Sequence, residues 1–184
     1  MKSYIQLNGF EMSKNILTHK IIDSLEIKKR NRELALEISH YYKNKEILII
    51  GVLKGCIYFL ADLTKLIDCE LLIEMISISS YKGKERSNIS FNSKLDFDIK
   101  DKNILIIEDI VDSGNTINFL VNQIKAKKPS DIKIVSFLFK PSVYKFKTNI
   151  DWIGFEIDDD FVIGYGLDYY GMYRNKQSVY KIIN

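Results

Sequence analysis

Apolar residues recur along the chain at two spacings, and the spacing separates predicted helices from predicted strands. In residues 24–42 the apolar side chains return every three or four positions, with Ile27 and Ile38 on one face and charged residues opposite. This pattern predicts an amphipathic helix, for which Ser24 is a suitable N-cap. Residues 46–52 are instead apolar without alternation, which is typical of a strand buried on both faces of a sheet.

The chain continues this alternation of strands and helices as far as Pro141. The pattern predicts helices at 55–68 and 115–128 and strands at 71–80, 103–107 and 131–140. Strands that alternate with helices indicate an α/β fold, in which a parallel twisted sheet is flanked by helices on both faces.

Beyond Pro141 the pattern changes to short strand-like pieces separated by acidic and glycine-containing turns. These pieces are residues 150–157, 161–167 and 178–184. They predict a small cap on the sheet, to which the N-terminal segment also contributes. We therefore expect a single domain over residues 1–184, with a core of about 26–140 and a cap from about 1–25 and 141–184.

Composition and charge argue against several classes of protein. With 46% hydrophobic and 28% charged residues, the 184-residue chain has the balance of a globular domain. Its net charge of +3, with both signs mixed along the chain, is too small to predict binding to nucleic acid. No segment has the apolar length of a signal peptide or a membrane span, and we expect no membrane association. The cysteines, Cys56 and Cys69, are expected to be reduced, which favours a cytoplasmic protein.

The strongest indication of chemistry lies in residues 104–117, ILIIEDIVDSGNTI. A buried strand runs into two adjacent acids, Glu108 and Asp109, and the turn that follows contains a glycine. In open α/β sheets, ligands bind beyond the carboxyl ends of the strands. Backbone N–H groups at the start of the next helix, with the Ser113 and Thr116 hydroxyls, predict a phosphate cradle. The acids would repel a phosphate, so we expect them to bind sugar hydroxyls or Mg²⁺.

A purely structural interpretation of this stretch is also open. Glu108 and Asp109 would then only end a strand, and either Asp112 or Ser113 would cap the helix. The stretch is not a Walker loop, because the Gly-Lys-Ser/Thr end is missing, and it lacks the G-x-G-x-x-G of dinucleotide-binding oxidoreductases.

The complete string resembles the ribose-phosphate motif of the type I phosphoribosyltransferases, and other segments resemble the hypoxanthine-guanine branch of that family. These segments are GVLKGCIYFLADL (51–63), SSYKG (79–83), LFKPS (138–142) and IGFEIDDDFVIGYGLDYYGMYRN (153–175). As an ordered set from about Glu26 to Arg174, they are highly specific. The resemblance implies the type I phosphoribosyltransferase fold with a small hood. It also implies an enzyme that transfers a phosphoribosyl group from 5-phosphoribosyl 1-diphosphate to N9 of hypoxanthine or guanine, with Mg²⁺ as cofactor.

The resemblance assigns the ribose and phosphate contacts to the motif after the buried strand. Glu108 and Asp109 match acids that hold the ribose hydroxyls, one of them directly or through Mg²⁺. Asp112 matches the catalytic residue beside N7 of the purine, where a carboxylate can act as general base or acid. The loop that holds the 5′-phosphate matches Asp112, Ser113, Gly114, Asn115 and Thr116.

Diphosphate binding is assigned to a loop and an arginine. Leu53, Lys54 and Gly55 resemble the family's diphosphate loop, which implies a cis peptide between Leu53 and Lys54. Arg174 matches the arginine that neutralises the diphosphate, a role for which a guanidinium group is well suited. Without the resemblance, Lys54 and Arg174 have the features of ordinary surface charges.

Purine recognition is assigned to later segments. Lys140 matches the lysine that donates to the purine O6, which favours a 6-oxopurine over adenine. Phe161 matches the aromatic residue that stacks on the base, and Val162 the position whose backbone meets its edge, although both types are common in cores. Asp168 matches the acid that helps to bind a second Mg²⁺ through water.

The resemblance also implies a lid and self-association. Ser80 and Tyr81 match the start of a flexible lid that closes over the reacting centre and excludes water. A homodimer or homotetramer follows from the resemblance alone. The chain departs from the family after Arg174, where it has no Leu-Pro step, and after Lys140, where the usual arginines are missing.

Two other functions agree with part of these features. A xanthine-preferring enzyme would share the fold and the mechanism, because recognition of the group at C2 of the purine is hard to predict. A non-catalytic regulator would keep the ribose-phosphate site and bind nucleic acid through a basic groove or an added domain. The chain shows neither room for an added DNA-binding domain nor the strong charge asymmetry of a basic groove. The presence of Asp112, Lys140 and Asp168 favours the enzyme.

Overall fold

The computed structural model describes residues 4–7, 10–13, 16–81, 88–91 and 97–183. Within these ranges, no helix has both the length and the apolar character needed to cross a membrane. The elements, in chain order, are β1 (Tyr4–Leu7), β2 (Phe10–Ser13), β3 (Thr18–Ile22), α1 (Ser24–Tyr41), β4 (Glu46–Leu53), α2 (Ile57–Thr64), β5 (Glu70–Tyr81), β6 (Asn88–Phe91), β7 (Asn103–Val111), α3 (Asn115–Lys125), β8 (Asp131–Phe139), β9 (Trp152–Glu156), β10 (Val162–Ile163) and β11 (Val179–Ile182).

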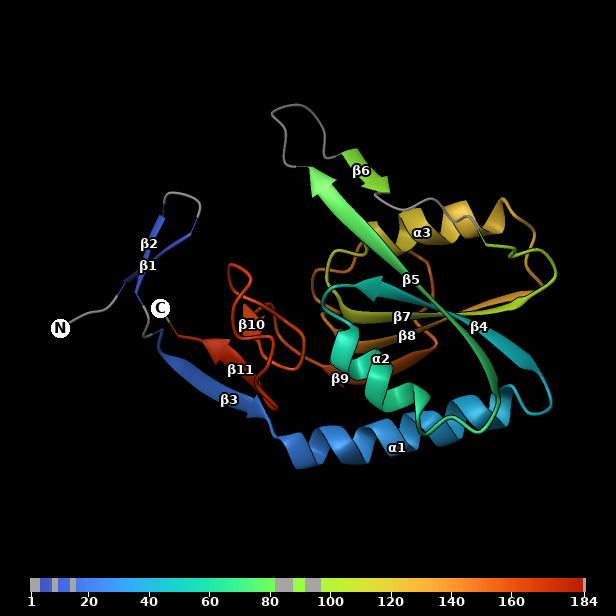
Figure 1. The fold of residues 1–184 in the computed structure, drawn as a ribbon, viewed down its shortest axis with the longest axis horizontal. Coiled ribbons are helices and arrows are strands. Elements are labelled where there is room, and N and C mark those ends of the chain that lie inside the picture. The colour runs from blue at the N-terminus through green and yellow to red at the C-terminus, as the bar shows by residue number, and fades with distance from the viewer. Residues whose placement is uncertain (1–3, 8–9, 14–15, 82–87, 92–96, 184) are drawn as a thin grey trace.

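A six-stranded sheet in the order β6-β5-β4-β7-β8-β9 forms the body of the molecule (Figure 1). The strands from β5 to β9 in this order are parallel, and β6 is antiparallel to β5. Buried residues of α1 and α2 belong to one hydrophobic cluster and those of α3 to another. Because alternate residues of β7 enter the two clusters, the helices cover opposite faces of the sheet. The predicted parallel sheet with helices on both faces is therefore confirmed.

The helix predicted at residues 24–42 forms as α1, but its N-cap is Asp23 and not Ser24. The Asp23 carboxylate accepts a hydrogen bond from the backbone N–H of Leu25, and the Glu26 carboxylate accepts one from the N–H of Asp23. In this capping box the two side chains satisfy the backbone N–H groups of Leu25 and Asp23 reciprocally. Asp23 therefore takes the N-cap position in place of Ser24.

β7 is longer than the predicted strand 103–107 and continues through Glu108 and Asp109 to Val111. Ile110 and Val111 are apolar and stay in register with apolar residues of β8, so the ladder extends beyond the two acids. The carboxylates therefore project from the last part of a strand and are held by its hydrogen bonds, not by a loop.

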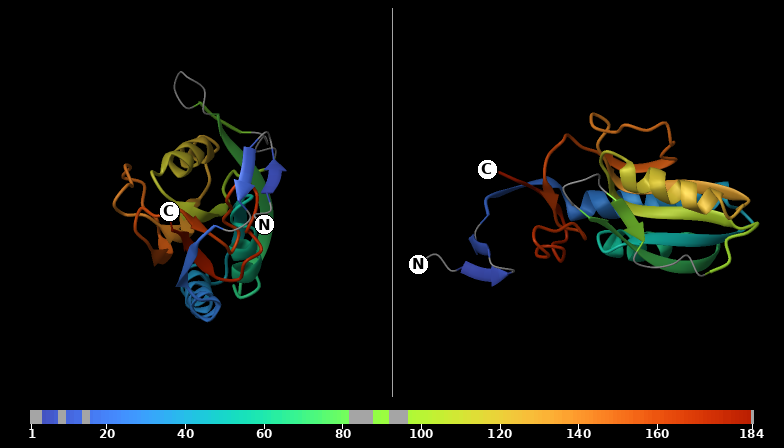
Figure 2. Two further views of the ribbon diagram at one scale, coloured as in Figure 1. Left: turned by 90° about the vertical axis from the view of Figure 1, so that its left-hand side faces the viewer. Right: turned by 90° about the horizontal axis from the view of Figure 1, so that it is seen from above.

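Three short strands from distant parts of the chain form the cap sheet, in the order β10-β11-β3 (Figures 1 and 2). β3 precedes α1 whereas β10 and β11 are near the C-terminal end, so both terminal segments contribute to the cap as predicted. The main sheet reaches beyond the core boundary predicted near residue 140, because β9 pairs in parallel with β8. The cap lies at the end of the main sheet toward which β4 points (Figure 1).

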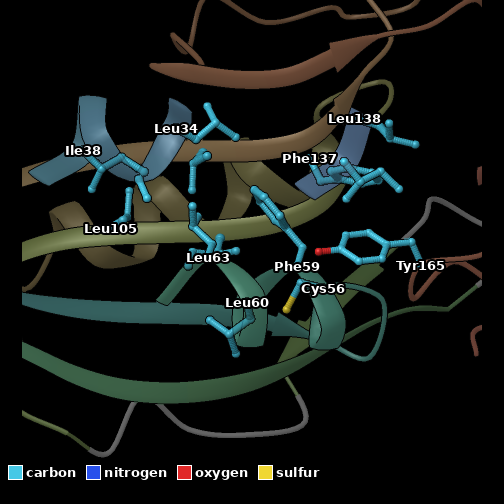
Figure 3. Packing of buried hydrophobic residues seen from close by; sticks show 14 of the residues in the cluster. Leu34, Ile38, Cys56, Phe59, Leu60, Leu63, Leu105, Phe137, Leu138 and Tyr165 are labelled. Atoms are coloured by element: carbon cyan, nitrogen blue, oxygen red, sulfur yellow. The ribbon is translucent and has the colours of Figure 1, made fainter. Parts of the chain in front are cut away.

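Aliphatic side chains and a few aromatic rings fill the space between the sheet and the helices α1 and α2 (Figure 3). The ring centroids of Phe59 in α2 and Phe137 in β8 are 5.4 Å apart, and Tyr165 lies 4.8 Å from Phe137. All three side chains are buried. This packing joins the segment after β10 to α2, which begins directly after the predicted diphosphate loop.

Candidate active site

A cavity of about 250 Å³ opens between the carboxyl ends of the parallel strands and the cap. Its walls come from the end of β7, from the residue after β8 and from the segment around β10. The lining residues are Asp109, Ile110, Asp112, Lys140, Asp160, Phe161, Val162, Leu167 and Asp168. The fold thus brings together candidate residues that are up to about sixty positions apart in the sequence.

The two adjacent acids of β7 are held in surroundings that disfavour their charge. Glu108 is 6% exposed, and among the described residues its Oε2 has no hydrogen-bond partner. Burial, and secondly the charge of Asp109, raise the pKa of Glu108 well above its usual value. Burial also raises the pKa of Asp109 to about 6, against backbone N–H donors and the Arg174 guanidinium that lower it. Both carboxyl groups would gain from a cation or from sugar hydroxyls beside them.

The turn after β7 leads into α3 without a side-chain cap. The N-cap is Gly114, which has φ +83°, so neither Asp112 nor Ser113 caps the helix. The Asn115 amide donates to the Ser113 hydroxyl at 3.0 Å. A Cβ at Gly114 would overlap the ring of Tyr144, which packs against this turn. The first backbone N–H groups of α3 therefore have no side-chain cap among the described residues, and such groups at a helix start are suited to an anion.

Lys140 is a buried ammonium group between two carboxylates. Its side chain is 8% exposed, and Nζ lies 2.9 Å from Asp159 Oδ1 and 3.7 Å from Asp112 Oδ2. The backbone N–H of Lys140 donates to the carbonyl of Val111 at 3.0 Å, which sets the residue beside the end of β7. A buried lysine held this way can donate a hydrogen bond into the cavity without becoming an unpaired charge.

Phe161 and Val162 share the cavity wall but differ in burial. Phe161 is 58% exposed, so it is not a core residue, and its ring meets Tyr169 edge to face at a centroid distance of 5.7 Å. Val162 is buried in β10, where it pairs with Lys181 of β11. An exposed aromatic face beside a buried strand provides a surface on which a planar ring can stack.

Arg174 forms an ion pair with Asp168, which lines the cavity. Arg174 Nη2 lies 2.5 Å from Asp168 Oδ1, and Nη1 donates to the carbonyl of Gly166 at 2.6 Å. The second Asp168 oxygen accepts a hydrogen bond from the backbone N–H of Gly171 at 2.6 Å. These contacts connect the two residues assigned to the diphosphate and to Mg²⁺ with the backbone of one segment.

The predicted diphosphate loop lies next to this pair and to Asp109. The peptide between Leu53 and Lys54 is cis, as the resemblance implies, and the Lys54 side chain is exposed. A Cβ at Gly55 would overlap Asp109 Oδ2, and a Cβ at Gly166 would overlap the carbonyl oxygen of Gly55. The backbone of Gly55 thus lies close to the Asp109 carboxylate on one side and to the backbone of Gly166 on the other. These two contacts connect Asp109, the loop and the segment after β10.

The residues assigned to the lid are only partly placed. Ser80 and Tyr81 are the last residues of β5, and their backbones pair with Ile89 and Asn88 of β6. Their side chains and residues 82–87 lie outside the described part of the chain, so the lid remains a prediction.

The sequence pattern does not single out several residues in and beside the cavity. Asp159 holds Lys140, while Asp160 and Leu167 line the wall. The run of three acids at 158–160, directly before an exposed aromatic residue, was the available signal. It was indistinguishable from a solvated turn until the lysine was placed beside it.

Comparison with known proteins identifies the family. The family model described as "Phosphoribosyl transferase domain" matches residues 18–170, which is most of the chain. The chain belongs to this phosphoribosyltransferase family.

Relatives within the family share one activity by name. The chain is 42% identical to the hypoxanthine-guanine phosphoribosyltransferase of Bacillus subtilis over 166 residues, which cover 89% of this chain and 92% of that protein. It is 39% identical to the hypoxanthine phosphoribosyltransferase of Buchnera aphidicola, with 89% and 94% covered. The crystal structure of a hypoxanthine-guanine phosphoribosyltransferase from Bacillus anthracis superposes with a TM-score of 0.87 at 33% identity, covering 92% of this chain and all of that one. The resemblance noted from the sequence, and the fold it implies, are confirmed.

Proposed function

We propose that this chain is a purine salvage enzyme that transfers the 5-phosphoribosyl group of 5-phosphoribosyl 1-diphosphate to N9 of hypoxanthine or guanine. The products are inosine or guanosine monophosphate and diphosphate. The observation that carries the proposal is the buried Lys140 Nζ, which faces the same cavity as Asp112 and the exposed ring of Phe161. Membership of the family and the names of its relatives support the same reaction.

Binding of the purine follows from the cavity wall. The base stacks on Phe161, and the Lys140 ammonium donates to O6. Adenine carries an amino donor at this position, so two donors would face each other and the amino group would find no acceptor there. Asp159 pairs with the Lys140 ammonium at 2.9 Å and holds it beside the cavity.

Proton transfer is the role proposed for Asp112. As N9 forms its bond to C1 of the sugar, the electrons of the C1–O bond leave with the diphosphate, and the purine loses one proton. A carboxylate beside N7 can hold or accept a ring proton during this step. The Asp112 side chain lies at the cavity and is about half exposed, with Oδ2 3.7 Å from the Lys140 ammonium.

The ribose 5′-phosphate is proposed to bind at the start of α3, and the ribose hydroxyls at the end of β7. The N–H groups of residues 113–116 meet the phosphate, with the Ser113 and Thr116 hydroxyls beside it. Glu108 and Asp109 accept hydrogen bonds from the ribose hydroxyls, which offsets the cost of burying these carboxylates.

Mg²⁺ fits the acids of the site as a partly hydrated ion. Among the described residues, no group of three His, Cys, Asp or Glu side chains is placed to hold a metal by itself. Mg²⁺ in phosphate-binding sites usually takes one or two carboxylates and completes its shell with water and substrate oxygens. Glu108, Asp109 and Asp168 are the proposed ligands, and the unpartnered buried Oε2 of Glu108 supports the need for a cation. When bound, Mg²⁺ neutralises charge on the diphosphate.

The leaving diphosphate is proposed to meet the 53–55 loop and Arg174. Backbone N–H groups of the loop and the guanidinium of Arg174 compensate its negative charge. Arg174 would exchange part of its contact with Asp168 for the diphosphate. Ser80 and Tyr81 are proposed to begin a lid that excludes water from the cation-like sugar.

We place the enzyme in the cytoplasm, with small-molecule substrates and neither nucleic acid nor membrane as partner. The mixed charges and the free cysteines, Cys56 and Cys69, support this placement.

The reaction is tested with the purified protein, Mg²⁺ and 5-phosphoribosyl 1-diphosphate, by measuring nucleotide formation from four bases. We expect inosine and guanosine monophosphates, slow reaction with xanthine and none with adenine. Xanthine as the best substrate would keep the mechanism and change the specificity, and one relative is named for hypoxanthine, guanine and xanthine. Tight binding of the sugar diphosphate with no nucleotide from any base would contradict the proposal and favour a non-catalytic regulator.

We also propose that the chain forms a homodimer or homotetramer, and an exposed apolar face supports this. Ile73 and Met75 of the strand β5 are 45% and 52% exposed, and Ile57 and Tyr58 of α2 are 46% and 42% exposed. The register of β5 with β4 places Ile73 and Met75 on the face of the sheet that α2 covers. Apolar side chains gathered at one edge of a soluble domain commonly mark an interface.

The Met75→Asp variant is expected to weaken self-association by at least about tenfold, because burying an unpaired carboxylate in an apolar interface is costly. Sedimentation velocity over a range of concentrations measures the effect. Leu36→Asp, at a position of α1 that is 71% exposed, is the matched control and should leave the assembly unchanged. Equal self-association of the Met75→Asp and Leu36→Asp variants would show that the interface lies elsewhere.

A further inference from the structure

A buried polar network surrounds the hydroxyl of Tyr165, outside the cavity of the candidate active site. Asn31 Nδ2 of α1 donates to this hydroxyl at 2.8 Å, and the hydroxyl donates to Asp62 Oδ2 of α2 at 2.8 Å. Asn31 and Tyr165 are both buried. Burial, followed by the Asp62 carboxylate, raises the pKa of the Tyr165 phenol, so the proton that it donates is retained.

The ring of Tyr165 also has several packing contacts. It lies 4.8 Å from the Phe137 ring and 6.3 Å from that of Tyr58, with which it is nearly parallel. Figure 3 shows Tyr165 beside Phe59 and Phe137, with its hydroxyl directed into the core. The side chain therefore anchors the segment after β10 to α1, α2 and β8 at once.

The backbone of Tyr165 shows what this anchor maintains. Its φ is +48°, in the left-handed region that residues with a Cβ seldom adopt, and its N–H donates to the carbonyl of Lys176 at 2.8 Å. A conformation of this kind persists only where the surrounding contacts enforce it, and such positions gather at functional sites.

The next residue transmits this placement to the site. Gly166, with φ +102°, lies so close to Gly55 that a Cβ would overlap its carbonyl oxygen. The carbonyl of Gly166 accepts a hydrogen bond from Arg174 at 2.6 Å, and Arg174 in turn pairs with Asp168. A shift of the backbone at Tyr165 would therefore move the diphosphate loop and Arg174 relative to Asp109.

We propose that Tyr165, held by Asn31 and Asp62, is a positioning residue for the diphosphate half of the active site. It acts through Gly166 on the 53–55 loop and through the Gly166 carbonyl on Arg174. This inference rests on the proposed function. The purine half of the site depends on Lys140 and Phe161, which do not contact this network among the described interactions, so the two substrates respond differently when it is broken.

Tyr165→Phe removes only the hydroxyl, and it is expected to raise the KM for 5-phosphoribosyl 1-diphosphate roughly fivefold to tenfold. The KM for hypoxanthine, measured at saturating sugar diphosphate, should stay within about twofold of the wild-type value. Binding is also measured without turnover, as the rise in Tm that Mg²⁺ and 5-phosphoribosyl 1-diphosphate produce together. This rise should be smaller in Tyr165→Phe than in the wild-type protein.

Tyr42→Phe is the control for a purely structural effect. The Tyr42 hydroxyl also donates inside the core, to the carbonyl of Ile104 at 3.2 Å, but it lies away from the site. The Tyr42→Phe variant should have a lower Tm than the wild-type protein in the absence of substrates, and both of its KM values should be unchanged. If Tyr165→Phe and Tyr42→Phe alter both KM values alike, Tyr165 contributes only to stability and the inference is wrong.

A second pair of variants keeps Tyr165 intact. Asp62→Asn preserves an oxygen that can accept from the Tyr165 hydroxyl, whereas Asp62→Leu does not. The KM for the sugar diphosphate should stay near the wild-type value in Asp62→Asn and rise in Asp62→Leu; equal values in the two would overturn the inference. Failure of the proposed function would appear differently, because the wild-type protein would then form no nucleotide although the thermal shifts could still be compared.

Discussion

Asp112→Asn is expected to lower kcat for nucleotide formation about a hundredfold, within the range that a general acid or base contributes. Asparagine keeps the shape of the side chain but cannot accept the ring proton at neutral pH. Because the proposed phosphate cradle at the start of α3 consists largely of backbone N–H groups, the KM for 5-phosphoribosyl 1-diphosphate should change by less than about threefold. Steady-state kinetics with hypoxanthine, supported by single-turnover measurements, separate the two effects.

The matched control for this change is Asp101→Asn. Asp101 precedes β7, at the opposite end of the strand from Asp112, and its side chain is 78% exposed. It has φ +58°, a conformation that asparagine accepts readily, so the fold and the kinetics should remain as in the wild type. A kcat for Asp112→Asn within about threefold of this control would remove Asp112 from the chemical step.

Gly55→Ala is expected to lower kcat/KM for 5-phosphoribosyl 1-diphosphate by about a hundredfold or more, since misplacement of a site by 1 Å can have this effect. The new Cβ would overlap Asp109 Oδ2. The carbonyl of Gly55 itself already lies against Gly166. Gly166 is approached through backbone, which cannot move aside freely, whereas the Asp109 contact is the end of a short side chain. The carboxylate of Asp109 must turn from the ribose, or the loop must leave its place beside Arg174.

Gly51→Ala provides the comparison for crowding alone. A Cβ at Gly51 would lie 3.0 Å from the end of the Leu60 side chain, which can rotate, and the residue is in β4 rather than in the loop. This variant should unfold at a lower temperature than the wild type yet keep its kcat/KM. Circular dichroism and thermal unfolding establish that Gly55→Ala is folded, and a folded Gly55→Ala with wild-type kinetics would show that the close approach to Asp109 is unimportant.

Much of the core could be predicted because its signals are local. The unbroken apolar runs at residues 46–52 and 103–107 specify strands buried on both faces, and the periodic face of residues 24–42 specifies a helix. The end of β7 was placed too early, since the apolar partners of Ile110 and Val111 on β8 are distant in the sequence. Similarly, β9 was assigned to the cap because nothing local in that segment shows which sheet it joins.

In the candidate site, too, some residues have a local signal in the sequence and others depend on distant partners. The motif at residues 104–117 predicts a phosphate site because its acids, glycine and hydroxyls are consecutive, and its resemblance to the family's motif assigns that site to ribose phosphate. Lys140, Phe161 and Arg174 could be assigned only through resemblance to a family, because each is ordinary by itself. Asp159 was missed for this reason: a carboxylate acquires a role only when a buried ammonium group lies 2.9 Å away.

The sequence by itself determined the class of fold and the family, since these depend on periodicity and on short contiguous motifs. Only the tertiary structure decided which carboxylates are buried, which one pairs with Lys140, and how closely Gly166 approaches Gly55. Burial, charge pairing and close approach of backbone arise between segments that are far apart in the chain. They depend on distances that exist only once the sheet, the helices and the cap have packed together.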